Sequence, residues 1–343
     1  MTASPLLVGI LYDFPQHDAG ASFEEAVRLG LDEVELDRPV ELVPRQAAGL
    51  PGGTAHDVRR NFDELVDEGV LVIIGPSISD NGLLVREWAD EARVPCINYT
   101  GGERTRSAFM FHYQVGSLAE EPIVLAEHLA ARQLQSAVVI HDKSPVGAGY
   151  VSAFEAVCDR VGIDIVGRSG ISPLATEAGA LVDRLRQSKP EALVYLGMGA
   201  ASRAVSLAIA DGGWDVTVVA NSALMFGYAR RDWRAGFEGW AYVDTVSDGN
   251  VRRRALKERS PKSAAGPVGV AAYDIGRLVG EALARAVHLT GGGVKEALEE
   301  VKRLPAATGY EGTTMGFGNY DHAALKGGYL VLRQWRDGKT REL

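Results

Sequence analysis

The sequence predicts an α/β fold made of two doubly wound lobes, each with a parallel sheet. Short β-branched apolar runs alternate with amphipathic helical stretches from the start of the chain to about residue 245, the pattern of parallel βαβ units. The alternation forms two successive series. With 343 residues, 46% of them apolar, the chain also exceeds the size at which one hydrophobic core usually keeps growing. We therefore expect two lobes of ordinary domain size.

The first series begins with a strand at Leu6–Tyr12. The next helix is expected to open at Ser22-Phe23-Glu24-Glu25, where Ser22 and Glu25 have the spacing of a capping box. Phe109–Val115 looks extended and is expected to connect the lobes. Strands and helices alternate between these points: strand Val40–Val43, helix Thr54–Glu68, strand Val70–Ile74, helix Asn81–Ala92 and strand Val94–Asn98.

The second series repeats the rhythm, and the tail departs from it. Its elements are strand Ala137–His141, helix Tyr150–Val161, strand Asp164–Val166, helix Glu177–Gln187, strand Ala192–Leu196, helix Ala200–Asp211, strand Val216–Ala220 and strand Trp240–Asp244. Two helices follow, Val268–Leu289 and Val294–Lys302, and Asp337-Gly338 indicates a final hairpin. We expect residues 1–118 and 248–318 in the first lobe and residues 119–247 and 319–343 in the second, joined by a multi-crossing hinge.

Composition restricts the partners. Lys and Arg total 36 against 45 Asp and Glu, a net charge of −9, which repels nucleic acid and anionic lipid surfaces. No apolar run reaches the roughly 18 residues that a membrane-spanning helix needs, so no membrane insertion is expected. The first residues show no export signal, which predicts a cytoplasmic protein unless such a segment was removed, with a periplasmic or extracellular location as the alternative. Cys96 and Cys158 are expected to be buried thiols.

Two polar loops follow neighbouring strands of the first series. The first reads Gly75-Pro76-Ser77-Ile78-Ser79, and the second reads Tyr99-Thr100-Gly101-Gly102. Ser79 lies where a strand gives way to a helix, so its hydroxyl and the free helix amides can bind a carboxylate or carbonyl oxygen. The second loop adds a hydroxyl and glycines that a ligand can approach closely. Together the loops predict a polar anchor for a small molecule.

These two loop sequences belong to a series of short motifs that are spread, in order, over nearly the whole chain. The series continues with Val138-Val139-Ile140-His141-Asp142, Gly147, Gly149, Tyr273-Asp274 and Gln334-Trp335-Arg336-Asp337-Gly338-Lys339. It resembles the type I periplasmic binding proteins, in particular the branched-chain amino acid (leucine/isoleucine/valine) class of ABC-transporter substrate-binding proteins. The resemblance implies a non-enzymatic protein that closes a hinged cleft on a small organic ligand. It implies an ABC-transporter membrane complex as partner, or a regulatory protein, and no cofactor, metal or catalytic residue.

Two departures from the family pattern bear on the ligand. Val146 stands where amino-acid-binding members usually have an aromatic residue, and the loop Asn221-Ser222-Ala223 lacks the acid that often holds an ammonium group. A buried ammonium without a carboxylate is costly, so aromatic or aliphatic carboxylates and amides are expected to bind better than α-amino acids. The expected ligand-binding residues are Phe14, Ser77, Ser79, Tyr99, Thr100, Gly101, Gly102, Met198, Ser222 and Met225. Their aromatic and methionine members fit a hydrophobic core equally well.

Two alternatives stay open on the sequence. An NAD(P)-dependent oxidoreductase is suggested by Gly147-Ala148-Gly149 and Gly197-Met198-Gly199 after strands, but Ser152 and Ser202 occupy the third glycine position. A cytoplasmic ligand sensor or regulator of the same fold would share every motif described here, because fold alone does not separate transport from sensing.

Overall fold

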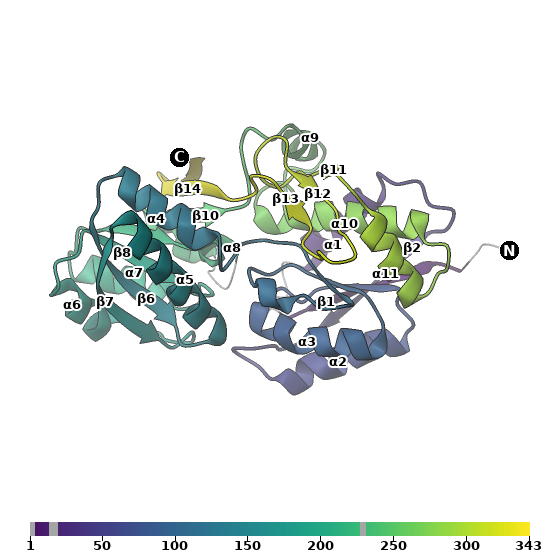
Figure 1. The fold of residues 1–343 in the computed structure, drawn as a ribbon, viewed down its shortest axis with the longest axis horizontal. Helices are drawn as coiled ribbons and strands as arrows, with labels where there is room; N and C mark the ends of the chain where they lie inside the picture. The colour runs from purple at the N-terminus through teal and green to yellow at the C-terminus, as the bar shows by residue number, and fades with distance from the viewer. Residues whose placement is uncertain (1–3, 14–19, 227–230) are drawn as a thin grey trace. The chain divides into compact units, whose positions relative to one another are not determined.

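The computed structural model describes residues 4–13, 20–226 and 231–343. The chain divides into two compact units (Figure 1). Unit 1 contains Met1–Val115 and Val246–Tyr329, and unit 2 contains Gly116–Thr245 and Leu330–Leu343. Residues 319–329, which we expected in the second lobe, therefore belong to unit 1.

Unit 1 is built on a five-stranded parallel sheet with the order β2-β1-β3-β4-β5. Its strands are β1 (Leu6–Tyr12), β2 (Val40–Gln46), β3 (Val72–Ile74), β4 (Cys96–Asn98) and β5 (Met110–His112). Helices α2 (Ala55–Asp67) and α3 (Ser79–Ala92) pack on one face of this sheet, where Phe62, Leu65 and Val85 form a core with Leu11 and Cys96. Thr54 caps α2 by accepting a hydrogen bond from the Asp57 amide.

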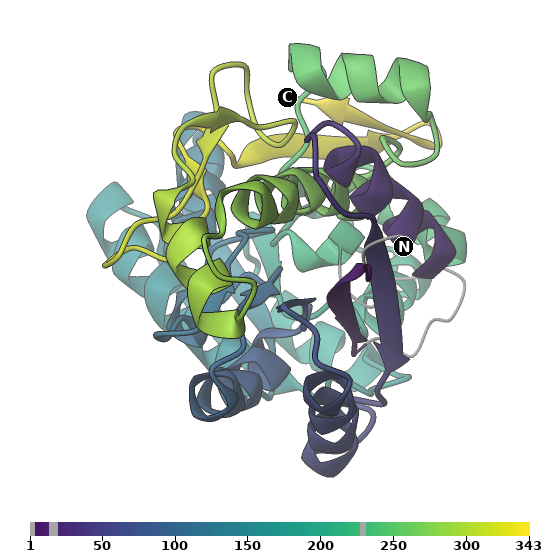
Figure 2. The same cartoon turned by 90° about the vertical axis from the view of Figure 1, so that its right-hand side faces the viewer.

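Two helices far apart in sequence lie side by side in unit 1, namely α1 (Gly20–Leu31) and α10 (Pro267–Arg285) (Figures 1 and 2). Glycine makes this close approach feasible. A Cβ at Gly30 would overlap the Tyr273 carbonyl oxygen, and a Cβ at Gly276 would overlap the Val27 carbonyl oxygen. The backbones of the two helices therefore touch, and larger residues at either glycine would separate them.

The remaining elements of unit 1 are short. They are the 3₁₀ helix η2 (Glu103–Thr105), helices α9 (Val251–Arg259) and α11 (Gly291–Glu300), and strands β11 (Leu304–Pro305), β12 (Thr314–Met315) and β13 (Leu325–Lys326). The three strands form a small antiparallel sheet. Residues 319–329 belong to this unit for two reasons. Strand β13 pairs with β12, and the backbone of His112 forms hydrogen bonds with the backbone of His322 and Ala324.

Unit 2 contains a seven-stranded sheet with the order β15-β14-β10-β9-β8-β6-β7. The strands β6 (Ser136–Asp142), β7 (Asp164–Ile171), β8 (Ala192–Leu196), β9 (Thr217–Ala220) and β10 (Ala241–Asp244) are parallel. The C-terminal hairpin of β14 (Val331–Arg336) and β15 (Lys339–Glu342) adds to β10 in antiparallel pairing. An α/β fold with parallel sheets is thus confirmed.

Alternate residues along the strands of unit 2 enter two separate cores, as expected when helices cover both faces. Val138 and Ile140 of β6 pack with α6 (Gly179–Arg186) and α7 (Ser202–Asp211). Ala137 and Val139 pack instead with α4 (Glu121–Ala131) and α5 (Pro145–Val161). The short helices α8 (Ala223–Phe226) and η3 (Arg231–Phe237) complete the unit.

Some local expectations need correction. Helix α1 begins at Gly20, so Ser22 lies inside its first turn and is not its N-cap. We did not expect α4, although Pro122 in its first turn is a typical helix-start signal. Cys96 and Cys158 are free and buried, as expected. Among the helices of the described ranges, none is both long and apolar enough to cross a membrane.

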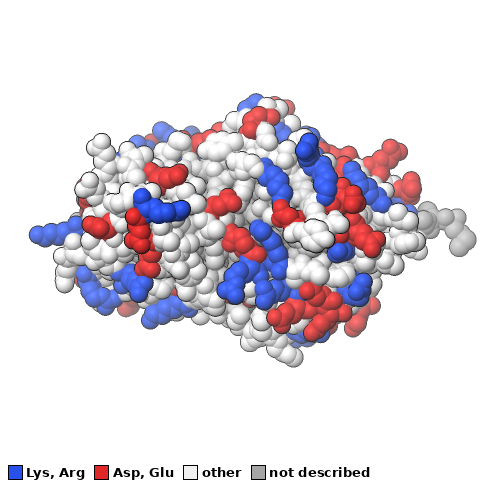
Figure 3. All heavy atoms as spheres, in the orientation of Figure 1, with Lys and Arg blue, Asp and Glu red and all other residues white. Residues whose placement is uncertain are grey.

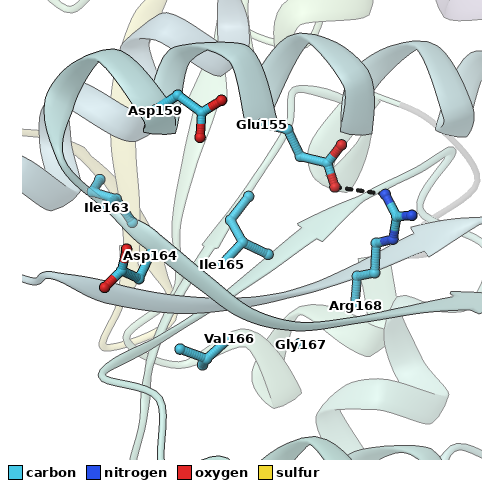
Figure 4. Close-up of a pocket in the computed structure, with 8 residues that line it drawn as sticks. All are labelled: Glu155, Asp159, Ile163, Asp164, Ile165, Val166, Gly167 and Arg168. Carbon is cyan, nitrogen blue, oxygen red and sulfur yellow. Dashed lines mark hydrogen bonds and ion pairs between the residues drawn. The ribbon is translucent and has the colours of Figure 1, made fainter.

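Charged side chains of both signs are interspersed on the face of the molecule drawn in Figure 3. A hollow of about 450 Å³ lies between α5 and β7 in unit 2 (Figure 4). Asp164 and Ile165, at the start of β7, and Asp159, near the end of α5, contribute to its lining. It therefore lies toward the amino ends of the strands, whereas ligands of such sheets bind beyond the carboxyl ends. We assign no ligand to it.

Candidate functional site

Each unit has one topological switch point, where loops from two neighbouring parallel strands turn to opposite faces and leave a crevice. In unit 1 it lies between β1 and β3, and in unit 2 between β6 and β8, because each sheet places its first strand between its second and third. Most of the ligand-binding residues expected from the sequence lie in loops at the carboxyl ends of β3, β4, β8 and β9. They form one half-site on unit 1 and another on unit 2.

The half-site of unit 1 is organised by Asp13, directly after β1. Its carboxylate is wholly buried and accepts hydrogen bonds from the Ser77 amide (2.9 Å), the Ile78 amide (3.0 Å) and Asn81 Nδ2 (2.9 Å). The Ser77 hydroxyl donates to the same carboxylate. Burial raises the pKa of Asp13, and these hydrogen bonds oppose the increase. Asp13 therefore fixes the loop after β3, and Ser77 serves this loop.

Ser79 begins α3 and is 8% exposed. Its hydroxyl donates no hydrogen bond to any residue that the structure describes, and a Cβ at Gly102 would lie 2.9 Å from its Oγ atom. The loops after β3 and β4 thus meet at Ser79 and Gly102. The Gly101 amide is likewise unpaired within the described part of the chain, and Gly101 is partly exposed. An uncommitted hydroxyl and a nearby uncommitted amide are suited to bind an oxygen acceptor.

Thr100 has a different role from the one its sequence position suggests. It is wholly buried, and its hydroxyl donates to Asn98 Oδ1 (2.9 Å) while accepting from the Gly102 amide (3.3 Å). His112 contacts the Thr100 carbonyl through Nε2 (2.8 Å), and burial lowers the pKa of this histidine to about 3. The hydroxyl of Thr100 is therefore used to shape the loop.

Tyr99 is 3% exposed and stacks on Phe23 of α1, with ring centroids 5.1 Å apart. Tyr12 meets the edge of the same Phe23 ring at 5.7 Å. The aromatic residues next to this half-site thus pack against one another. Phe14 lies outside the described residues.

The half-site of unit 2 repeats the arrangement. Asp142, at the end of β6, is buried and accepts a hydrogen bond from the Met198 amide (2.5 Å) in the loop after β8. Gly197 leaves room for it, because a Cβ there would overlap the Asp142 carboxylate. Asp13 and Asp142 therefore occupy equivalent positions, and each carboxylate fixes a loop that follows a neighbouring strand. The loop after β9 follows: Asn221 Oδ1 accepts from the Gly197 amide (3.1 Å), while its Nδ2 atom is buried without a partner among the described residues.

The acid that the Ser222 loop lacks in sequence is supplied by Glu121 of α4. Glu121 is wholly buried, and its carboxylate accepts from the Ser222 amide (2.6 Å) and the Ser222 hydroxyl (3.0 Å). The Ser117 amide and the Tyr150 hydroxyl also donate to it, each at 2.7 Å. Burial raises the pKa of Glu121 to about 7 against the lowering effect of these hydrogen bonds. The loop itself carries no acid, as expected from the sequence, but a buried carboxylate from α4 contacts it.

The structure thus brings the expected residues together in two groups: Ser77, Ser79, Tyr99, Thr100, Gly101 and Gly102 in unit 1, and Met198 and Ser222 in unit 2. Met225, 8% exposed, belongs to the hydrophobic core beneath α6 and α7. Sequence reasoning missed Asp13 and Glu121. Asp13 directly follows a buried strand, which is readable in the sequence. Glu121 begins a helix next to a proline, which indicates the helix but not the burial of the carboxylate. Among the described residues, no group of three or more His, Cys, Asp or Glu side chains could hold a metal ion.

The fold, with a cluster of polar loops at the switch point of each unit, defines a two-unit protein of the α/β class. The chain belongs to the periplasmic binding protein family, whose model matches residues 5–339. A curated relative, the Leu/Ile/Val-binding protein homolog 3 of Brucella melitensis biotype 1, is 26% identical over 209 residues, which make up 61% of this chain. The match spans only about half, 52%, of that relative's length.

Solved structures with the same fold cover almost the whole chain. A periplasmic binding protein type 1 from Bordetella pertussis Tohama I superposes with a TM-score of 0.83 at 16% identity, covering 99% of this chain and 100% of the other. A leucine binding protein from Thermotoga maritima gives a TM-score of 0.82 at 16% identity, with 99% and 98% covered. An ABC transporter substrate-binding protein from Desulfitobacterium hafniense, in complex with Leu, gives 0.81 at 18% identity, with 99% and 100% covered.

Proposed function

We propose that this protein is a non-enzymatic solute receptor of an ABC transporter and that its ligand is a small organic molecule with a carboxylate or amide carbonyl group. The observation that carries the proposal is a pair of donors in unit 1 that bond to none of the residues the structure describes, the Ser79 hydroxyl and the Gly101 amide. They stand at a switch point, where ligands of such sheets bind. A helix N-terminus beside them favours a negative charge.

The relatives support this class of function. Their names describe leucine and Leu/Ile/Val binding and ABC-transporter substrate binding. They lend no support to the cytoplasmic sensor alternative. The membrane complex that would receive the ligand is part of the proposal, as is closure of the two lobes over it.

The glycine-rich loops argue against the oxidoreductase alternative. A Cβ at Gly147 would overlap the Asp142 carbonyl oxygen, and one at Gly197 would overlap the Asp142 carboxylate. These glycines therefore make room for a buried aspartate. In a dinucleotide-binding loop the corresponding space is needed for the approach of a pyrophosphate, and a buried carboxylate would repel it.

A finer question is whether the ligand also carries an ammonium group. Glu121 is buried behind Ser222 and engages four donors, so it does not stand open to an ammonium group. We therefore retain the prediction that carboxylates and neutral amides bind better than the matching α-amino acids. Titration calorimetry on matched pairs tests it, with leucine against 4-methylpentanoate and phenylalanine against phenylpropionate. Micromolar binding of the amino acids, with no binding of the acids, would refute the preference but leave the receptor class intact.

A further inference from the structure

The buried Glu121 has no role in the anchoring of ligand proposed for unit 1. It lies at the first residue of α4, and the four hydrogen bonds that it accepts from described residues all come from within unit 2. Three donors converge on Oε1, namely the Ser117 amide and the hydroxyls of Tyr150 and Ser222, while the Ser222 amide is the single described donor to Oε2. Ser222 thus provides half of the donors that this carboxylate receives.

These contacts determine what Ser222 can do. A serine has one backbone N–H and one hydroxyl proton to donate, and in Ser222 both point to Glu121. Its hydroxyl oxygen can still accept a hydrogen bond, but it has no proton left for a ligand. The contact also requires Gly116, because a Cβ there would overlap both Glu121 Oε1 and Ser222 Oγ. Three elements, the Gly116 segment, α4 and the loop after β9, therefore meet at one carboxylate.

We propose that Glu121 is a positioning residue of the unit 2 half-site, which holds Ser222 in place while it is ionised and releases it when it takes up a proton. The proposal rests on the proposed function only in that Ser222 is a ligand-contacting residue. A protonated carboxyl group carries a hydrogen on one oxygen, and Oε2, with a single donor, is the oxygen with room for it. That hydrogen competes with the Ser222 amide, or donates to Ser222 Oγ and frees the serine hydroxyl to turn away.

The surroundings make this exchange accessible near neutral pH. Burial raises the pKa of Glu121 to about 7. Tyr150, from α5, is the titratable group that meets the carboxylate, and it does so as a neutral donor. Strand β10 also packs against α4 and carries Tyr242 and Asp244. The Tyr242 hydroxyl bonds with Thr340, and Asp244 accepts from the Thr245 amide. None of the contacts described for Glu121 is with a cation.

The test follows the exchange of the Ser222 amide hydrogen by NMR in the ligand-free protein between pH 5.5 and 8, corrected for the intrinsic exchange rate. We expect protection of this amide to be about tenfold or more higher at pH 8 than at pH 5.5, as loss of a hydrogen bond to a charged group implies. Glu121→Gln should abolish this pH dependence. Glu120→Gln is the matched control, because Glu120 is the preceding residue and is exposed, and it should behave like the unsubstituted protein.

Equal protection of Ser222 at both pH values in the unsubstituted protein would overturn the proposal, and this result does not depend on whether the glutamine variant folds. An unchanged pH profile in Glu121→Gln would overturn it as well. The second arm measures binding of 4-methylpentanoate and leucine at the same pH values. A tenfold step in Ser222 protection without binding of either compound would support the role of Glu121 in holding Ser222 and count against the proposed ligand class alone.

Discussion

The stability of unit 2 should depend on pH through Glu121 in a direction that is unusual for a carboxylate. Carboxylates that are paired or hydrogen-bonded in the folded state usually stabilise it most when they are ionised. Here burial outweighs the hydrogen bonds and raises the pKa from 4.5 to about 7. A group whose pKa is raised on folding contributes stability that is fully present below its unfolded pKa and is lost as the pH rises through its folded pKa.

The magnitude follows from the shift. Each pKa unit corresponds to about 1.4 kcal/mol, so a shift from 4.5 to about 7 removes roughly 3 kcal/mol from the free energy of unfolding between pH 4.5 and pH 8. Glu121→Gln has no proton to lose. The difference in unfolding free energy between the unsubstituted protein and this variant should therefore change by roughly 3 kcal/mol over that range, with the variant gaining relative stability as the pH rises.

Urea unfolding monitored by tryptophan fluorescence is a suitable assay. Four of the five tryptophans, Trp214, Trp233, Trp240 and Trp335, belong to unit 2, and a Trp88→Phe background removes the signal from unit 1. Other groups titrate equally in both proteins and cancel in the difference. Glu120→Gln should show no such trend. Curves that stay parallel within about 0.5 kcal/mol from pH 4.5 to 8 would mean that Glu121 does not titrate as its burial implies.

Three further predictions concern the half-sites. Ser79→Ala should weaken binding of a carboxylate ligand by about 1 to 3 kcal/mol at an unchanged melting temperature, and calorimetry showing equal affinity would remove Ser79 from the site. Asp13→Ala should cost about 3 to 5 kcal/mol of unfolding free energy, because it leaves buried amide donors without an acceptor, and a loss below about 1 kcal/mol in urea unfolding would show that the loop rearranges. Gly116→Ala should displace Ser222 and cost about 1 to 3 kcal/mol by overpacking, and a crystal structure with Ser222 unmoved would contradict this.

The sequence predicted the order of strands and helices well, because hydrophobic periodicity reports which face of an element is buried. Strand β1 and the Cys96 thiol are examples: an unbroken apolar run and a thiol inside one both indicate burial. The sequence did not predict helix α4, because its run of apolar residues is short and because Glu120 and Glu121 suggest a solvated loop. Burial of Glu121 depends on Ser222, 101 residues further along, and no local pattern contains that contact.

The polar loops were located correctly, but the direction of their hydroxyl groups was not predictable. Ser79 and Thr100 look alike in sequence, each a hydroxyl residue after a buried strand. The structure separates them, since the Thr100 hydroxyl donates to Asn98 whereas the Ser79 hydroxyl donates to no residue in the described ranges. The deciding partner, Asn98, is an inward-facing residue at the end of a strand, and its orientation depends on the pairing of β4 with β5.

The contact between α1 and α10 has a consequence for biosynthesis. Unit 1 is discontinuous, and α1 packs on a helix that begins at Pro267, far beyond the end of the first segment at Val115. At about 5 to 20 residues per second, the ribosome needs roughly 12 to 50 seconds after the end of α1 at Leu31 to reach the start of α10 at Pro267. During this interval the face of α1 that contains Gly30 lacks its partner helix, whereas the parallel strands of unit 2 are all present once Thr245 has emerged. The parallel strands of unit 2 are therefore complete before unit 1 receives α10.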